Sequence, residues 1–273
     1  MNTIAIINDN SPADLHAAAL GFIIARKFNA RIFVCHTAKK EELKHHKVKA
    51  LSHTHHNDHH SFTDKLFAGN PGLNNADYCV EEIHLSGFNA HSFAEFVIKD
   101  KVDSVIKGMP RGTHKKETEK KSDVYSVLNR VQCPLMLVPE HWEIKDFEQI
   151  TYITDLRYCR IQIVRYLAQM AAVFDAGLSI AHFSARGLPD LTEPYAHNLF
   201  ADTVACNTGY PKLFFNNIRE TGLLKAMDVL INGMNNDLIV LINHRFHFKE
   251  IVGEFVGHSL PPHITVPLLI FPY

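Results

Sequence analysis

Runs rich in apolar residues alternate with amphipathic stretches along the first half of the chain. The runs cover residues 3–7, 31–35, 78–83, 104–106 and 135–138. Runs of this kind are typical of strands that are buried on both faces of a sheet. Between them, apolar residues recur at helical spacing at 12–28, 90–99 and 123–131. Strands that alternate with helices predict right-handed crossovers and a parallel sheet covered by helices on both faces.

The second half of the chain repeats this order. Strands are predicted at 150–153, 178–182, 212–215, 238–242 and 268–271, and helices at 160–174, 194–206, 221–232 and 248–258. Residues 102–111 match residues 236–245 at an offset of 134, and residues 133–139 match 266–272 at an offset of 133. A matched order of segments at nearly constant offset predicts a duplicated domain. We place the two copies at 1–141 and 146–273, and both fall in the common size range of domains.

Two segments are more polar than the rest, and a short linker joins the two halves. Residues 39–67 have helical spacing but a strongly polar composition, and residues 108–121 predict a polar loop. The linker at 140–147 is short. The two sheets are therefore expected to lie close together.

Composition excludes several classes of partner. The net charge is −1, so no overall field attracts nucleic acid or an anionic membrane. No apolar stretch approaches the roughly 18 residues of a membrane span. The N-terminus begins with a strand-like run, so no secretory signal is expected. The 5 cysteines are odd in number and widely spaced, which favours a reducing, cytoplasmic setting.

Histidines concentrate in residues 45–60, at His45, His46, His53, His55, His56, His59 and His60. If this segment is helical, three of them share one face, and histidines at such spacing chelate divalent metals. No cysteine or carboxylate triad completes the set, so no metal site is expected. A solvated, variable segment and a pH-responsive surface remain alternatives.

Three features occur in both halves. An aspartate follows the first strand, an apolar fourth strand runs into a loop, and an X-Pro pair precedes the last strand. They begin at Asp9, Asp103 and Cys133-Pro134 in the first half, and at Asp155, Asp237 and Val266-Pro267 in the second. In this order they resemble the universal stress protein family, as a tandem of two copies that covers essentially the whole chain.

The resemblance implies an α/β fold of two tandem Rossmann-like domains. Each is expected to be a five-stranded parallel sheet in the order 3-2-1-4-5, flanked by helices. The last strands, at 135–138 and 268–271, are expected to pair with each other and form an internal dimer. A homodimer of the whole chain and an unknown protein partner also remain open.

ATP-binding members of this family carry Gly-x-x-Gly, nine further residues, and then Gly-Ser or Gly-Thr. Such glycines let backbone N–H groups close around phosphates, and the hydroxyl residue heads a helix. Gly108 matches the first glycine and Ser122 the hydroxyl residue. Arg111 stands at the second glycine with Gly112 beside it, and Lys121 stands at the third. The motif is half intact and cationic.

The candidate cofactor-binding residues are therefore Asp9, Gly108, Gly112 and Ser122. The resemblance places Asp9 against the adenosine part of a ligand, whereas a strand-end aspartate also caps a following helix. In the second half both loop glycines are replaced, and Glu254 stands where Ser or Thr belongs. ATP is therefore possible in the first half only, and no cofactor is expected.

Motifs of catalysis are not found. The chain has no Gly-x-Ser-x-Gly, Walker loop or His-Glu-x-x-His, so no catalytic residues are expected. The resulting hypothesis is a cytoplasmic universal stress protein that binds a regulatory ligand in a stress response and is not an enzyme. One alternative is an ATP-binding member with slow hydrolysis in the first half. The other is a metal or pH sensor that uses residues 45–60.

Overall fold

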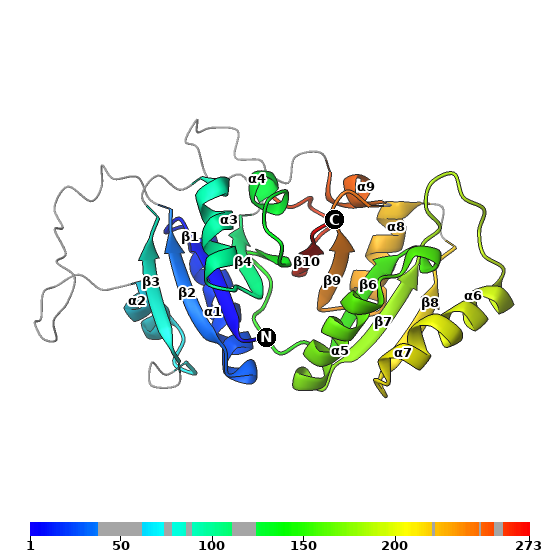
Figure 1. The fold of residues 1–273 in the computed structure, drawn as a ribbon, viewed down its shortest axis with the longest axis horizontal. Coiled ribbons are helices and arrows are strands. Elements are labelled where there is room, and N and C mark those ends of the chain that lie inside the picture. The colour runs from blue at the N-terminus through cyan, green and yellow to red at the C-terminus, as the bar shows by residue number, and fades with distance from the viewer. Residues whose placement is uncertain are drawn as a thin grey trace, which may run out of the picture.

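The computed structural model describes residues 1–37, 62–73, 78–85, 89–110, 124–219, 222–245, 247–253 and 259–273. Within them, ten strands form one sheet (Figure 1). Their order is β3 (Val80–His84), β2 (Arg31–His36), β1 (Thr3–Asn8), β4 (Ser104–Met109), β5 (Leu135–Pro139), β10 (Leu268–Phe271), β9 (Leu238–Ile242), β6 (Gln149–Thr154), β7 (Gly177–His182) and β8 (Leu213–Asn217). Each half therefore has the order 3-2-1-4-5, which confirms the predicted fold.

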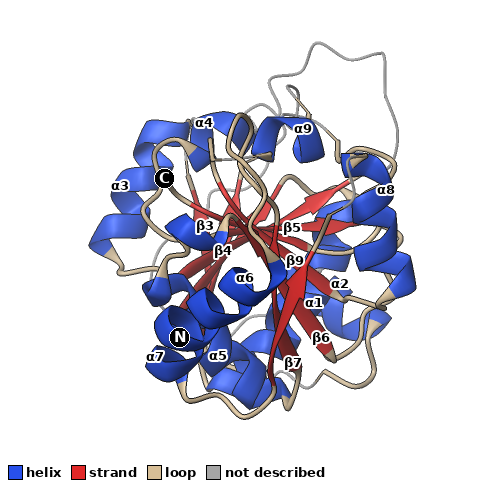
Figure 2. Ribbon diagram, turned by 90° about the vertical axis from the view of Figure 1, so that its right-hand side faces the viewer, coloured by secondary structure: helices blue, strands red, loops and turns tan. Residues whose placement is uncertain are grey.

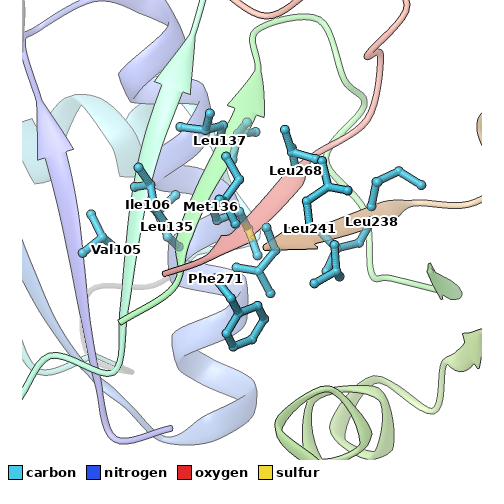
Figure 3. Packing of buried hydrophobic residues seen from close by; sticks show 14 of the residues in the cluster. Val105, Ile106, Leu135, Met136, Leu137, Leu238, Leu241, Leu268 and Phe271 are labelled. Carbon is cyan, nitrogen blue, oxygen red and sulfur yellow. The ribbon is translucent and has the colours of Figure 1, made fainter. Parts of the chain in front are cut away.

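The two halves of the sheet meet at its centre, where β5 pairs with β10. This pairing is antiparallel, with Leu269 opposite Met136, whereas the neighbouring strands within each half are parallel. Side chains of both halves pack around this joint (Figure 3). The pairing covers two edges that would otherwise be free to associate with other chains. The expectation that the last strands face each other within one chain is confirmed.

Helices cover both faces of the sheet, which runs through the middle of the molecule (Figure 2). In the first half they are α1 (Pro12–Phe28), α2 (Phe62–Gly69), α3 (Ala90–Lys99) and α4 (Val124–Leu128). The second half has α5 (Ile161–Phe174), α6 (Glu193–Leu199), α7 (Cys206–Thr208), α8 (Leu223–Asp228) and α9 (Phe248–Val252). Short segments η2 (Leu156–Tyr158), η3 (Phe200–Ala205) and η4 (Val229–Gly233) adjoin α5, α6 and α8.

Helix α1 begins and ends as its sequence dictates. The hydroxyl of Ser11 accepts a hydrogen bond from the Asp14 amide, and Pro12 occupies the first turn, where its missing N–H costs nothing. Asn29 ends the helix in the left-handed conformation. Small buried alanines on this helix let it approach the sheet closely. The first turn of α1 is thereby held against the end of β4.

Several predicted boundaries differ from the structure. The fourth strand was expected to end at residue 106, but β4 continues to Met109, so Gly108 lies inside a strand. Of the helix expected at 39–67, α2 is described, and residues 38–61 lie outside the described residues. The helix expected at 123–131 is α4, which ends at Leu128. The domain boundaries at 141 and 146 stay a prediction.

The linker between the two halves is tied to both of them. His16 Nε2 in α1 donates a hydrogen bond to the Trp142 carbonyl at 2.7 Å. The Trp142 ring stacks on Phe147, and Phe147 contacts Phe174 in α5. Lys27 pairs with Asp146 at 2.5 Å. These contacts add to the β5–β10 pairing and hold the halves in one arrangement.

Candidate functional site

The sheet of each half has one point where ligands of parallel α/β folds usually bind. The second and third strands lie on one side of the first strand, and the fourth and fifth strands lie on its other side. The connections that follow the first and fourth strands therefore lead to opposite faces of the sheet, and a crevice is expected between the carboxyl ends of these two strands. In the first half this point lies between β1 and β4. Asp9 follows β1, and Lys107 and Gly108 are at the end of β4. The structure thus brings Asp9 and Gly108, two of the four candidate residues, to one place.

A buried carboxylate joins these residues. Asp14, in the first turn of α1, is fully buried. Its Oδ2 accepts a hydrogen bond from the Asp9 amide at 2.7 Å, and its Oδ1 accepts one from the Gly108 amide at 3.0 Å. Lys107 Nζ lies 3.3 Å from both oxygens of Asp14 and 3.6 Å from Oδ2 of Asp9. We call Asp9, Asp14 and Lys107 the first-half charge cluster.

The two carboxyls of this cluster have opposite pKa shifts. For Asp9, burial raises the pKa, but the Lys107 ammonium and hydrogen bonds from its neighbours outweigh burial and lower it to about 2. For Asp14, burial raises the pKa to about 7; the Asp9 charge adds to this, and Lys107 opposes it. At neutral pH one ammonium is therefore offset by one or two carboxylates. The cluster offers no excess positive charge to a phosphate.

Gly108 has a packing role that explains why a glycine stands there. A Cβ atom at this position would lie 2.0 Å from the carbonyl oxygen of Ala13 and 2.5 Å from the amide of Asp14. Its own amide is already bonded to Asp14. Gly112 and Ser122 lie outside the described residues. A phosphate-binding role for Gly108, Gly112 and Ser122 therefore stays a prediction.

Asp9 is partly engaged within the chain. Its Oδ1 accepts a hydrogen bond from the Ser11 amide at 2.9 Å, which shapes the turn into α1. Its side chain is 18% exposed, so it remains reachable from solvent. The helix-entry role is thus present in the structure, and a ligand contact stays a prediction. Sequence reasoning missed Asp14 and Lys107, although a charged residue within an apolar strand was a signal for a buried partner.

A hydrogen-bonded histidine network lies beside this site. The Asn8 side chain accepts from the Asn10 amide through Oδ1, so its Nδ2 donates to Nδ1 of His36 at 3.0 Å. The other ring nitrogen of His36 then carries the proton and donates to Glu82 at 3.0 Å. This bond outweighs burial and holds the pKa of Glu82 below its ordinary value. Both nitrogens of His36 are used within the chain, as is typical of a structural histidine.

Evidence for a metal site is not found where the chain is described. Among those residues, no group of three or more His, Cys, Asp or Glu is placed to hold a metal ion. The histidines at 45–60 lie outside the described residues, so their role stays a prediction.

In the described part, no helix combines the length and apolar character needed to cross a bilayer.

Asp155, the counterpart of Asp9, is saturated by its own chain. Its carboxylate accepts hydrogen bonds from the Arg157 amide at 3.0 Å, from Arg157 Nε at 2.9 Å, from Arg157 Nη2 at 2.6 Å and from the Ala185 amide at 2.8 Å. A carboxylate offers about four acceptor positions. Burial raises its pKa, but these donors outweigh burial and lower it. Asp155 therefore fastens the loop after β7 to the end of β6.

We expect Asp155→Ala to lower the free energy of unfolding by about 1–3 kcal/mol at neutral pH, because charged hydrogen bonds are lost and their partly buried donors are left without this acceptor. The folded pKa of Asp155 is lowered, so its stabilisation is present above its unfolded pKa and is lost as the pH falls through the folded value. Urea unfolding across the acid range should show the difference from the native protein shrinking below about pH 4. A difference that stays constant would contradict this role.

Solved structures of three bacterial and archaeal proteins have a similar fold over the whole chain. A universal stress protein from Archaeoglobus fulgidus aligns with a TM-score of 0.61 and 12% identity, over 99% of this chain and 98% of its own. A putative universal stress protein from Pseudomonas aeruginosa gives 0.58 and 10%, over 100% and 93%. A protein of unknown function from the same species gives 0.57 and 10%, over 100% and 92%.

No family model matches the sequence, and no curated protein matches it. At 10–12% identity the structural likenesses show the fold and not the ligand. The resemblance noted in the sequence is confirmed at that level: the chain has the fold of a tandem universal stress protein.

Proposed function

We propose that this protein is a cytoplasmic, regulatory ligand-binding protein of the universal stress type, and that it is not a turnover enzyme. The observation that carries the proposal is the amide of Gly108. In the family it would face a phosphate, and here it donates to the buried Asp14 at 3.0 Å. The carboxylate of Asp155 is likewise saturated within the second half. Neither half therefore offers the family's nucleotide contacts intact.

An ATP-binding role for the first half is the second candidate. Asp9 is 18% exposed at the switch point, and the chain beyond β4 is rich in lysine. Each lost contact to phosphate is a charge-assisted hydrogen bond worth on the order of 1.5–3 kcal/mol. The loss of one or two would weaken binding by roughly ten- to a few thousand-fold. Any ATP affinity of this half is therefore expected to be low.

The nucleotide content of the purified protein and a calorimetric titration with ATP test the two candidates. We expect no co-purified adenine nucleotide, and only weak binding to the first half. One ATP per chain at low micromolar affinity, abolished by Asp9→Ala or Ser122→Ala, would establish the second candidate instead. Two ATP per chain would show that the loss of both loop glycines in the second half does not prevent binding.

A further inference from the structure

Two arginines meet the ring of Tyr273 at the carboxyl edge of the second half. Arg245 lies with its Cζ 4.2 Å from the ring centroid, and its Nη2 donates to the tyrosine hydroxyl at 2.5 Å. Arg160 has its Cζ 5.5 Å from the same centroid. Tyr273 is 66% exposed, so this group is open to solvent.

The topology explains why residues so far apart in sequence come together. Arg160 follows β6, Arg245 follows β9 and Tyr273 follows β10. Strand β9 pairs in parallel with both β6 and β10, so the carboxyl ends of these three strands lie at the same edge of the sheet. In Figure 1 the C-terminus lies there, beside α9. The carboxyl ends of the paired strands β6 and β9 form the switch point of the second half, where ligands of such folds bind.

Arg160 and Arg245 bring two positive charges to this edge. In the part of the chain that the structure describes, no carboxylate forms an ion pair with Arg160 or Arg245. The acids nearby have other partners: Asp155 pairs with Arg157, and Glu250 pairs with His247 at 2.6 Å and with Arg186 at 3.8 Å. Two guanidinium groups on one ring repel each other unless an anion joins them.

We propose that Arg160, Arg245 and Tyr273 form a binding site for a small oxyanion, the phosphate or carboxylate group of a ligand. Guanidinium groups bind both in a bidentate manner through paired N–H donors. The Tyr273 hydroxyl accepts from Arg245, which leaves its own proton to donate to the anion. Two positive charges favour a dianionic phosphate over a carboxylate. The site uses side chains and needs none of the loop glycines that the second half has lost.

Calorimetric titration of the full chain with inorganic phosphate, at constant ionic strength, tests the site. We expect saturable binding of one phosphate in the millimolar range or tighter. Arg160→Gln and Arg245→Gln should each weaken it by about tenfold or more, which is a change of about 1.4 kcal/mol or more. Arg165→Gln is the matched control, because Arg165 is exposed on α5 and, among the residues that the structure describes, donates to the Asn207 carbonyl. The affinity of the Arg165→Gln variant for phosphate should equal that of the native protein.

Further variants separate a binding role from a structural one. Arg245→Lys keeps the charge but loses the paired donors, so weaker phosphate binding with an unchanged melting temperature supports the site. Tyr273→Phe keeps the ring and loses the hydroxyl, so it should weaken binding by a few-fold. Saturation by acetate with equal affinity would assign the site to carboxylates.

Two results would overturn the site: no saturable binding of either anion, or an equal loss in Arg165→Gln. The outcome is independent of the ATP titration. Phosphate binding without ATP binding would support both proposals. Failure of phosphate binding alone would leave the proposed function standing.

Discussion

Replacing Lys107 by methionine is expected to lower the free energy of unfolding by about 3–5 kcal/mol at about pH 8, and by less at about pH 5. Lys107 is only 6% exposed, and its ammonium lies 3.3 Å from Asp14 and 3.6 Å from Asp9. Methionine fills a similar volume but cannot neutralise either acid. Two carboxyls would then face each other at the end of β1 without a counter-charge.

The pH dependence follows from Asp14. Its folded pKa is about 7, above the ordinary 3.8, so the folded state binds more protons than the unfolded state between these values. Its contribution to stability is therefore complete below 3.8 and is lost as the pH rises through 7. Without Lys107, the backbone hydrogen bond from Asp9 still lowers the pKa of Asp14, but the opposing ammonium is gone, so this loss grows larger and extends to higher pH. Because the native Asp14 ionises near pH 7 and the variant's Asp14 does so only at higher pH, the gap between the native protein and Lys107→Met should widen as the pH rises above about 7.

Guanidinium unfolding at several pH values between about 5 and 8 measures this gap. Lys212→Met is the matched control, because Lys212 is 45% exposed and pairs with the exposed Asp175. Exposed pairs contribute about 0–1 kcal/mol, so the control should change stability little at any pH. A constant gap for Lys107→Met would show that Asp14 does not titrate in this range.

The alternation of strands and helices could be predicted because the inner strands are buried over nearly their whole length, whereas the edge strands β3 and β8 are only partly buried. The apolar runs at β9 and β10 mark strands without help from the rest of the chain. The same holds for the joint of the two halves, since β5 and β10 are the last runs of two matched copies. Because the two halves repeat the same order of segments, each strand predicted in one half supported the prediction of the matching strand in the other half.

The end of β4 could not be predicted from the same pattern. Lys107 interrupts the apolar run, so the predicted strand stopped at residue 106, whereas β4 continues through Met109. The charge is tolerated because Asp14, 93 residues earlier, meets it in the fold. At the matching position of the second half stands Leu241, which is buried. The repeat therefore predicted the backbone and not the buried charges.

The proposed oxyanion site was hidden for a similar reason. Arg160, Arg245 and Tyr273 follow three different strands, and no spacing in the sequence links them. In the sequence, Arg245 stands at the position of the second loop glycine in the second half, and this replacement favoured the loss of a site. The structure shows two guanidinium groups against the ring of Tyr273, which favours a different site at the same switch point.

Replacing Gly108 by alanine is expected to lower the free energy of unfolding by about 3 kcal/mol or more, the upper end of overpacking effects. The added Cβ would lie 2.0 Å from the Ala13 oxygen and 2.5 Å from the Asp14 amide, and both are backbone atoms. The strand cannot move away without breaking the bond from the Gly108 amide to Asp14. Chemical denaturation measures the loss.

Gly69→Ala is the control for this variant, because no atom lies within 4 Å of its added Cβ. It should leave stability unchanged or raise it by up to about 1 kcal/mol, since alanine restricts the unfolded chain. If Gly108→Ala unfolds like the native protein, the close approach of β4 to α1 does not constrain this position. The phosphate-loop interpretation would then be the remaining reason for a glycine there, and Gly108→Ala should weaken ATP binding instead.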